Sequence, residues 1–237
     1  SAPEIIAMAA PDGYFSKVNP AFCNLLGYSM EEITSQPFSN FIHPDDLNGT
    51  SKEYSETITG ERQANNFVNR YRTKKGDYRW ISWSSSKVFG EEGFVFAFGH
   101  DVTEVKELEL LLQRATEMAR IGSWELNITE ENQDKMYWSP ITREILEVDA
   151  DYDPSLSGGF EFYQESSKAL IKSSVEKLIK TGEEFDLELL ITTALGNERW
   201  VRCIGQSERI GGRCAKIFGS FQDIHSLKVA ELEQQSL

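Results

Sequence analysis

The residues of this sequence with the greatest capacity for chemistry are its three histidines. His43 lies in a turn whose Asp45 and Asp46 can cap the helix that follows. His100 ends a predicted strand, where it is either an ordinary polar residue or one that points inward. His225 opens the last predicted helix but lacks the His-Glu context of a phosphoacceptor, so autophosphorylation is not expected there. We therefore expect structural roles for the histidines.

Three cysteines, Cys23, Cys203 and Cys214, form the second reactive set. They contain no CxxC pair and cannot all pair with one another, which predicts free thiols in a reducing compartment. Across a hairpin that turns at 211–212, Cys203 would face Ser220 and Cys214 would face Arg209, a poor geometry for a disulfide. All three are expected to be buried or half-buried thiols.

Composition and motifs argue against catalysis and against negatively charged partners. The formal net charge of -14 disfavours binding to nucleic acid or to an anionic membrane. The sequence has no P-loop, HExxH motif or nucleophile elbow, and its carboxylates are dispersed, so we expect neither an enzyme nor a metal site. The longest apolar run, 94–98, is too short to cross a bilayer. We expect a cytoplasmic segment, whose parent protein could still be membrane-anchored.

The elements that must position these residues follow one pattern that occurs twice, as the length of 237 residues allows. Three features recur 120 positions later: Asn19-Pro20 as Ser139-Pro140, Gly76 as Gly196, and Trp80 as Trp200. In the first copy, a helix capped near residue 19 precedes predicted strands at 67–73, 78–88 and 94–102. In the second, strands at 124–126 and 136–138 flank the polar stretch 127–135, and a helix ends near Gly182.

A predicted helix at 101–120 joins the two copies. Asp101 or Thr103 can cap its first turn. Its apolar residues recur at heptad spacing and form a seam, which consists of Val105, Leu108, Leu112, Ala115 and Ala119. This pattern is compatible with an amphipathic helix that lies on its own domain, or with a connector that pairs between chains. Two heptads are too few to decide between these alternatives.

The order of these motifs resembles the PAS domain family. In the first copy the resemblance rests on residues 19–22, 25–28 and 41–46 (FIHPDD), on Gly76-x-x-Arg79-Trp80, and on Asp101-Val102-Thr103. In the second it rests on residues 139–140 and 182–185, on Gly196-x-x-Arg199-Trp200, and on Asp223-Ile224. The second copy lacks the HPDD turn near 162–165, and His225 replaces the usual threonine. Together the two copies cover nearly the whole chain.

The resemblance implies an α+β fold with two PAS-like domains, each a five-stranded antiparallel sheet with short helices on one face. The expected bounds are 1–103 for the first domain, 104–120 for the connecting helix, 121–225 for the second domain, and 226–237 for the start of a signalling helix. Such domains often hold a ligand between sheet and helices. We expect Tyr71, Phe96 and Phe98 either to line such a pocket or to form core, and alternation places Trp80 and Trp83 on opposite faces of the sheet.

The family's known cofactors do not fit this sequence well. Haem-binding members place an axial histidine on the helix before the last three strands, and the corresponding segments, 51–63 and 166–184, contain none. Photoactive flavin members carry their reactive cysteine in a different helix from the one that holds Cys23. Haem and covalent flavin are therefore not expected, and the identity of any ligand stays open.

The resemblance also implies a role in signalling. We expect a sensory or relay input region that controls a downstream output domain through helical linkers and homodimerisation, with Asp101, Thr103 and Asp223 as relay residues. A sensor histidine kinase is the expected parent protein, and a diguanylate cyclase is the alternative. A small molecule is a possible ligand. The competing interpretation is a structural dimerisation and spacing module with filled cores.

Overall fold

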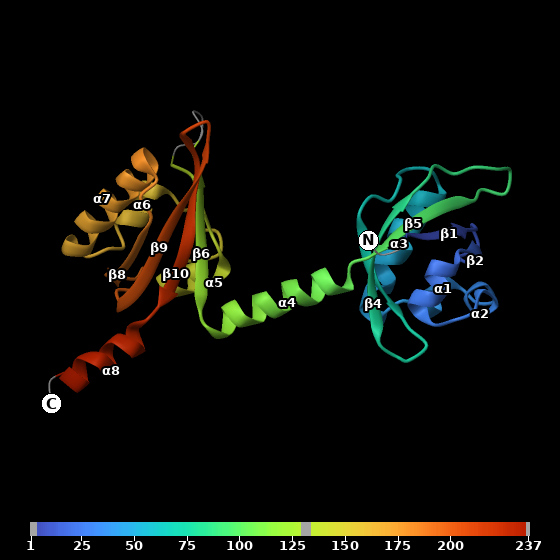
Figure 1. Cartoon of the computed structure of the whole chain (residues 1–237), viewed down its shortest axis with the longest axis horizontal. Helices are drawn as coiled ribbons and strands as arrows, with labels where there is room; N and C mark the ends of the chain where they lie inside the picture. Colours follow the sequence, from blue (N-terminus) through green and yellow to red (C-terminus); the bar gives the residue numbers. More distant parts are fainter. Residues whose placement is uncertain (1–3, 129–133, 236–237) are drawn as a thin grey trace. The chain divides into compact units, whose positions relative to one another are not determined.

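The computed structural model describes residues 4–128 and 134–235. The chain divides into two compact units, Ser1–Leu111 and Leu112–Leu237. The division falls within helix α4 (Thr103–Met118), so the predicted connecting helix forms as one element (Figure 1). The centre of the polar stretch 127–135 and the last two residues of the chain lie outside the described residues. Within the described part, no helix combines the length and apolar character needed to span a membrane.

The first unit is an antiparallel five-stranded sheet with the spatial order β2-β1-β5-β4-β3. Its strands are β1 (Ile5–Ala9), β2 (Phe15–Val18), β3 (Phe67–Arg72), β4 (Tyr78–Ser85) and β5 (Val95–Asp101). Its helices are α1 (Pro20–Leu26), α2 (Met30–Thr34) and α3 (Leu47–Ile58), with 3₁₀ turns η1 (Phe38–Phe41) and η2 (Pro44–Asp46). The helices connect β2 to β3, which leaves β3, β4 and β5 as consecutive neighbouring strands.

The second unit repeats this arrangement in the order β7-β6-β10-β9-β8. Its strands are β6 (Ile121–Asn127), β7 (Met136–Trp138), β8 (Phe185–Thr192), β9 (Glu198–Ile210) and β10 (Arg213–Asp223). Its helices are α5 (Pro140–Leu146), α6 (Leu156–Phe160), α7 (Glu165–Thr181) and the terminal α8 (His225–Gln235). The predicted α+β class, with two five-stranded antiparallel sheets, is therefore confirmed.

The first helix of each unit begins in the same way but ends on a different residue type. Asn19 accepts a hydrogen bond from the Phe22 amide at 3.2 Å, and Ser139 accepts one from the Thr142 amide at 3.3 Å. Helix α1 ends on Gly27 with φ 77°, a left-handed conformation that glycine adopts at little cost. Helix α5 ends on Glu147 with φ 56°. A glutamate in this region is strained, so an interaction of its side chain must compensate.

Strand alternation sorts the sheet residues between a helix-covered face and an outer face. Trp83 is 6% exposed and packs in the core with Phe22 of α1. Trp80 lies on the other face, where the Arg70 guanidinium is 4.8 Å from its ring centroid. The prediction that the two tryptophans occupy opposite faces is confirmed. In the second unit, α5 and α7 share a single core with one face of the sheet.

The last hairpin corrects one predicted pairing. Cys214 faces Arg209 as expected, but Cys203 faces Phe221 rather than Ser220. A bulge between Cys214 and Lys216 adds one residue to β10, which shifts every later pair by one position. All three cysteines are free thiols, with Cys203 buried and the other two half-buried, as predicted.

Candidate functional site

The first candidate site is the junction between the first sheet and α4. The Asp101 carboxylate accepts hydrogen bonds from the Thr103 amide at 3.0 Å and from the Thr103 hydroxyl at 2.5 Å. The same hydroxyl oxygen accepts a hydrogen bond from the Trp80 amide at 2.9 Å. Because a hydroxyl can donate and accept at once, Thr103 joins the end of β5, the edge of β4 and the start of α4. The structure thus brings the predicted relay residues Asp101 and Thr103 into direct contact.

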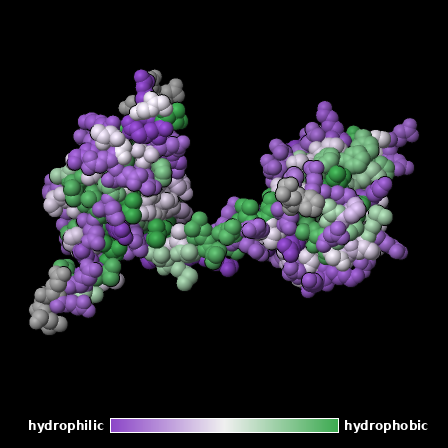
Figure 2. Space-filling model, in the orientation of Figure 1, coloured by the Kyte–Doolittle hydropathy of each residue, from purple (hydrophilic) through white to green (hydrophobic). Residues whose placement is uncertain are grey.

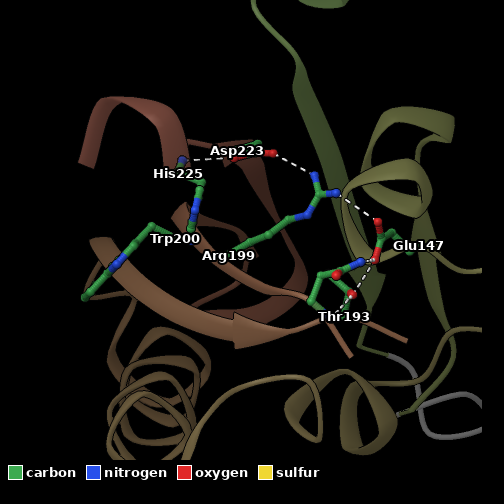
Figure 3. Close-up of polar contacts among 7 residues, drawn as sticks. Glu147, Thr193, Arg199, Trp200, Asp223 and His225 are labelled. Atoms are coloured by element: carbon green, nitrogen blue, oxygen red, sulfur yellow. Dashed lines mark hydrogen bonds and ion pairs between the residues drawn. The ribbon is translucent and has the colours of Figure 1, made fainter. Parts of the chain in front are cut away.

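The second junction, between β10 and α8, has the same backbone plan with a different side chain (Figure 3). The Asp223 carboxylate accepts a hydrogen bond from the His225 amide at 2.9 Å. In place of the threonine hydroxyl, Nδ1 of His225 accepts from the Trp200 amide at 3.4 Å. The predicted relay residue Asp223 therefore occupies the position that Asp101 has in the first unit.

An arginine clamp stabilises the second junction further (Figure 3). Arg199 contacts Asp223 and Glu147, in each case with 2.9 Å between nitrogen and oxygen. Glu147 also accepts hydrogen bonds from Asn197 at 2.7 Å and from the Thr193 hydroxyl. The Thr193 and Asn197 hydrogen bonds, followed by the charge of Arg199, lower the pKa of the Glu147 carboxyl. The clamp links the end of α5, the turn between β8 and β9, and the start of α8.

The first junction lacks this clamp. Arg79 is the counterpart of Arg199, and its nearest guanidinium nitrogen lies 4.0 Å from Asp101. Its buried Nε has no hydrogen-bond partner among the described residues. Gly27 stands where the second unit has Glu147, so no carboxylate is available from α1. The replacement of Gly27 by Glu147 is visible in the sequence repeat. The pairing of Glu147 with Arg199 is not, because the two residues are far apart along the chain.

Helix α4 exposes the predicted seam. The exposed fractions of its largest residues are 55% for Val105, 59% for Leu108 and 66% for Leu112. Ala115 and Ala119 are also exposed, and the apolar side chains are visible along α4 in Figure 2. A continuous apolar face of this kind indicates a contact surface.

A cavity of about 80 Å³ lies between α3 and the sheet of the first unit. Tyr71 lines it, but Phe96 and Phe98 do not, so the predicted three-residue lining is wrong for these two. Val95 and Ala97 point to the cavity instead, and alternation turns Phe96 and Phe98 to the outer face of the sheet. There Phe96 stacks on Phe89 with 4.8 Å between ring centroids.

The second unit has a cavity of about 50 Å³ lined by Trp124, Tyr163 and Cys203, among other residues. The Trp124 indole nitrogen is buried and has no oxygen or nitrogen acceptor in the described part of the chain. It interacts with the Cys203 thiol. Burial raises the pKa of the Cys203 thiol to about 12. Both cavities are much smaller than typical ligand pockets of roughly 300–1,000 Å³.

The remaining histidines have local roles. Nδ1 of His43 accepts a hydrogen bond from the Asp45 amide at 3.2 Å and so stabilises the turn η2. Asp46 does not cap α3 with its side chain as expected, because its carboxylate instead binds the Arg70 amide and guanidinium at 2.7–2.9 Å. His100 is largely exposed and lies 3.8 Å from Glu4.

Comparisons with known proteins agree with the fold. Residues 15–98 match the family model described as PAS fold. The probable diguanylate cyclase DgcE of Escherichia coli is 25% identical over 201 residues, which cover 81% of this chain and 18% of that protein. The blue-light-activated histidine kinase of Brucella anthropi is 24% identical over 249 residues, which cover 94% of this chain and 49% of that protein.

A solved structure of a sensory box histidine kinase/response regulator from Burkholderia thailandensis is also similar. It has 21% sequence identity and a TM-score of 0.41, and the similarity covers 53% of this chain and 98% of that one. The chain spans less than half the length of the two curated relatives above. Residues 15–98, in the first unit, thus match the PAS fold, and the second unit has the same strand order.

Proposed function

We propose that the chain is a sensory or relay input region of a larger signalling protein. Its two sheet-to-helix junctions would pass a conformational change to an output domain, and the chain itself would carry out no catalysis. A sensor histidine kinase is the parent protein that we favour, and a diguanylate cyclase is the alternative. One relative of each kind is 24–25% identical to this chain. Free thiols favour the cytoplasm as its location.

The exposed seam of α4 is the observation that carries this proposal. A partner surface would stabilise this exposed apolar row at heptad spacing, because removing apolar side chains from water is favourable. We propose that the partner is the same seam of a second copy. The two helices would run parallel, because both copies then deliver their output domains to the same end of the pair.

The junctions give this helix pair its input. Thr103 ties the first turn of α4 to β4 and β5 through the Trp80 amide and Asp101. A change in the sheet that moves these strands would therefore move the start of the helix. Within a packed pair, such a movement becomes a rotation or a shift in register, since side chains interlock in discrete arrangements. Asp223 would act in the same way at α8.

The test is the association constant of the chain after a charge is placed in the seam. Leu112→Glu introduces carboxylates that face each other across a parallel pair, and we expect association to weaken at least about 10-fold, as measured by sedimentation equilibrium. Leu110→Glu is the matched control, because Leu110 is also exposed, at 45%, but lies away from the seam. Equal association constants for wild type and Leu112→Glu would refute the paired connector.

A second candidate function, direct sensing of a small ligand, is favoured by one feature of the second unit. The Trp124 indole N–H interacts with the Cys203 thiol beside the cavity of this unit and has no oxygen or nitrogen acceptor among the described residues. A cavity of about 50 Å³ admits water or a molecule of a few heavy atoms that accepts a hydrogen bond. Native mass spectrometry tests this candidate. An additional mass that disappears on denaturation supports sensing, whereas a bare mass supports filled cores and a relay role.

A further inference from the structure

The two junctions differ in a group that can change its charge. In the first, the Trp80 amide donates to a threonine hydroxyl at 2.9 Å. In the second, the equivalent Trp200 amide donates to Nδ1 of His225 at 3.4 Å. Threonine does not titrate in the physiological range, whereas histidine commonly changes charge between roughly pH 5 and 8. The second junction therefore depends on a hydrogen-bond acceptor that a proton can remove.

Protonation would act directly on this contact. Neutral imidazole accepts a hydrogen bond through one ring nitrogen, but both nitrogens of imidazolium are donors. With a proton on Nδ1, His225 would present an N–H group to the Trp200 N–H group. The amide would lose its acceptor, and the first turn of α8 would lose one of its side-chain contacts with β9. Asp223 would still accept from the His225 amide, and the Trp200 carbonyl would still accept from the Ile224 amide at 3.0 Å, so the chain would remain anchored.

Charged residues surround the second junction. Asp223, at the end of β10, and Glu198 and Arg199, on β9, line the same open pocket as His225. On α8, Lys228 lies 5.8 Å from the Trp200 ring centroid and pairs with Glu188 of β8 and with Glu231. Arg199 is already paired with Glu147 and Asp223. Acidic and basic groups thus both lie near the junction, and among the described residues the side-chain acceptor for the Trp200 amide is Nδ1 of His225.

We propose that His225 makes the second junction sensitive to pH: protonation removes the side-chain acceptor of the Trp200 amide and loosens the first turn of α8 on β9, while the first junction does not respond. The sign follows from the contact. The contact requires neutral His225, so it is made when Nδ1 carries no proton and is lost when a proton binds there. This property belongs to the junction itself and does not depend on whether α8 controls an output domain.

Amide hydrogen exchange of the whole chain, measured by NMR at pH 8 and pH 5.5 and corrected for intrinsic rates, tests the proposal. At the lower pH, protection of the Trp200 amide should fall about 2- to 12-fold, the loss expected for one hydrogen bond, while protection of the Trp80 amide stays constant. In His225→Thr, which retains His43 and His100, the Trp200 amide should stay protected at both pH values.

Two outcomes would overturn the proposal. One is an unchanged Trp200 protection factor in the wild type between the two pH values. The other is an equal loss in wild type and His225→Thr, because this result would assign the pH effect to other groups. The reciprocal variant Thr103→His adds a positive test, since it should make the Trp80 amide pH-sensitive. If that larger side chain does not fit, the His225→Thr comparison still decides.

Discussion

The two sheet-to-helix junctions share a backbone plan but are held together differently. In the first, a threonine hydroxyl and an aspartate provide the contacts, and Arg79 lies 4.0 Å from Asp101 with no second carboxylate beside it. In the second, Arg199 joins two carboxylates at 2.9 Å each. One fold can therefore hold the helix after its last strand loosely in one copy and tightly in the other. We infer that the second junction is the stiffer of the two.

A strained residue supports this interpretation. Glu147 keeps a left-handed backbone conformation, with φ 56°, where the first unit has Gly27. A glutamate pays a conformational cost there that glycine does not. Its carboxylate compensates by binding Arg199, Asn197 and Thr193. The second unit thus gains a clamp between α5 and α8 at the expense of backbone strain, as is common where structure serves function.

The largest expected effect that separates the junctions is the loss of the arginine. Arg199→Ala leaves the carboxylates of Glu147 and Asp223 without their cation, and we expect the free energy of unfolding of the second unit to fall by about 2–3 kcal/mol. Arg79→Ala, at a side chain 40% exposed, should cost about 1 kcal/mol or less. Urea unfolding followed by tryptophan fluorescence measures both. Equal losses would contradict the difference between the junctions.

A second contrast concerns the thiols of the two units. Burial raises the pKa of Cys203 to about 12, so little thiolate forms at pH 8, whereas Cys23 in the first unit is half-buried. We expect Cys203 to react with a thiol reagent at least about 10-fold more slowly than Cys23 in the folded protein. The rates should become similar in denaturant. Variants that each retain one cysteine, the other two being replaced by serine, measure the two rates separately.

The smallest expected effect is the pH dependence of the clamp. The pKa of Glu147 is lowered in the folded protein, so its stabilisation is present above the ordinary carboxyl range and is lost as pH falls through the lowered pKa. Glu147→Gln should therefore have a lower urea midpoint than wild type at pH 7, and the difference should shrink towards pH 3. A difference that stays constant with pH would show that the charge of Glu147 is not involved.

The repeat made much of the fold predictable. The spacing of 120 between Asn19-Pro20 and Ser139-Pro140 located both helix starts, and the glycine at 182 marked a helix end that the structure shows with φ 81°. Asp101 and Asp223 were placed at the junctions because each ends the last strand of its copy. Local signals of this kind are reliable, since caps and turns depend on few neighbouring residues.

Features that depend on distant packing could not be predicted. The run 94–98 is apolar at every position, so alternation could not show that Val95 and Ala97 face the cavity and that Phe96 and Phe98 face outward. The buried Trp83 pairs with Gly99 of β5 and fills the core beside this strand. The space that remains inside is therefore suited to small residues. The bulge after Cys214 was likewise invisible to a register counted from the turn.

The clamp was missed for a related reason. Glu147 and Arg199 are 52 positions apart, and neither residue is unusual on its own. The signal that could have revealed them was the replacement of Gly27 by Glu147 between the two copies, because a charged residue at a left-handed helix end needs a partner. Comparison of repeats within one chain can therefore identify functional differences that no single motif shows.

Parallel pairing of the α4 seams of two copies can be tested by disulfide cross-linking. In a Cys23→Ser, Cys214→Ser background, Leu112→Cys places a thiol at the seam, and Leu110→Cys places one at an exposed control position. Parallel pairing predicts that mild oxidation links Leu112→Cys chains into covalent dimers at low protein concentration, while Leu110→Cys chains pair but stay largely uncross-linked. Equal cross-linking of the two variants, or none at position 112, would contradict it.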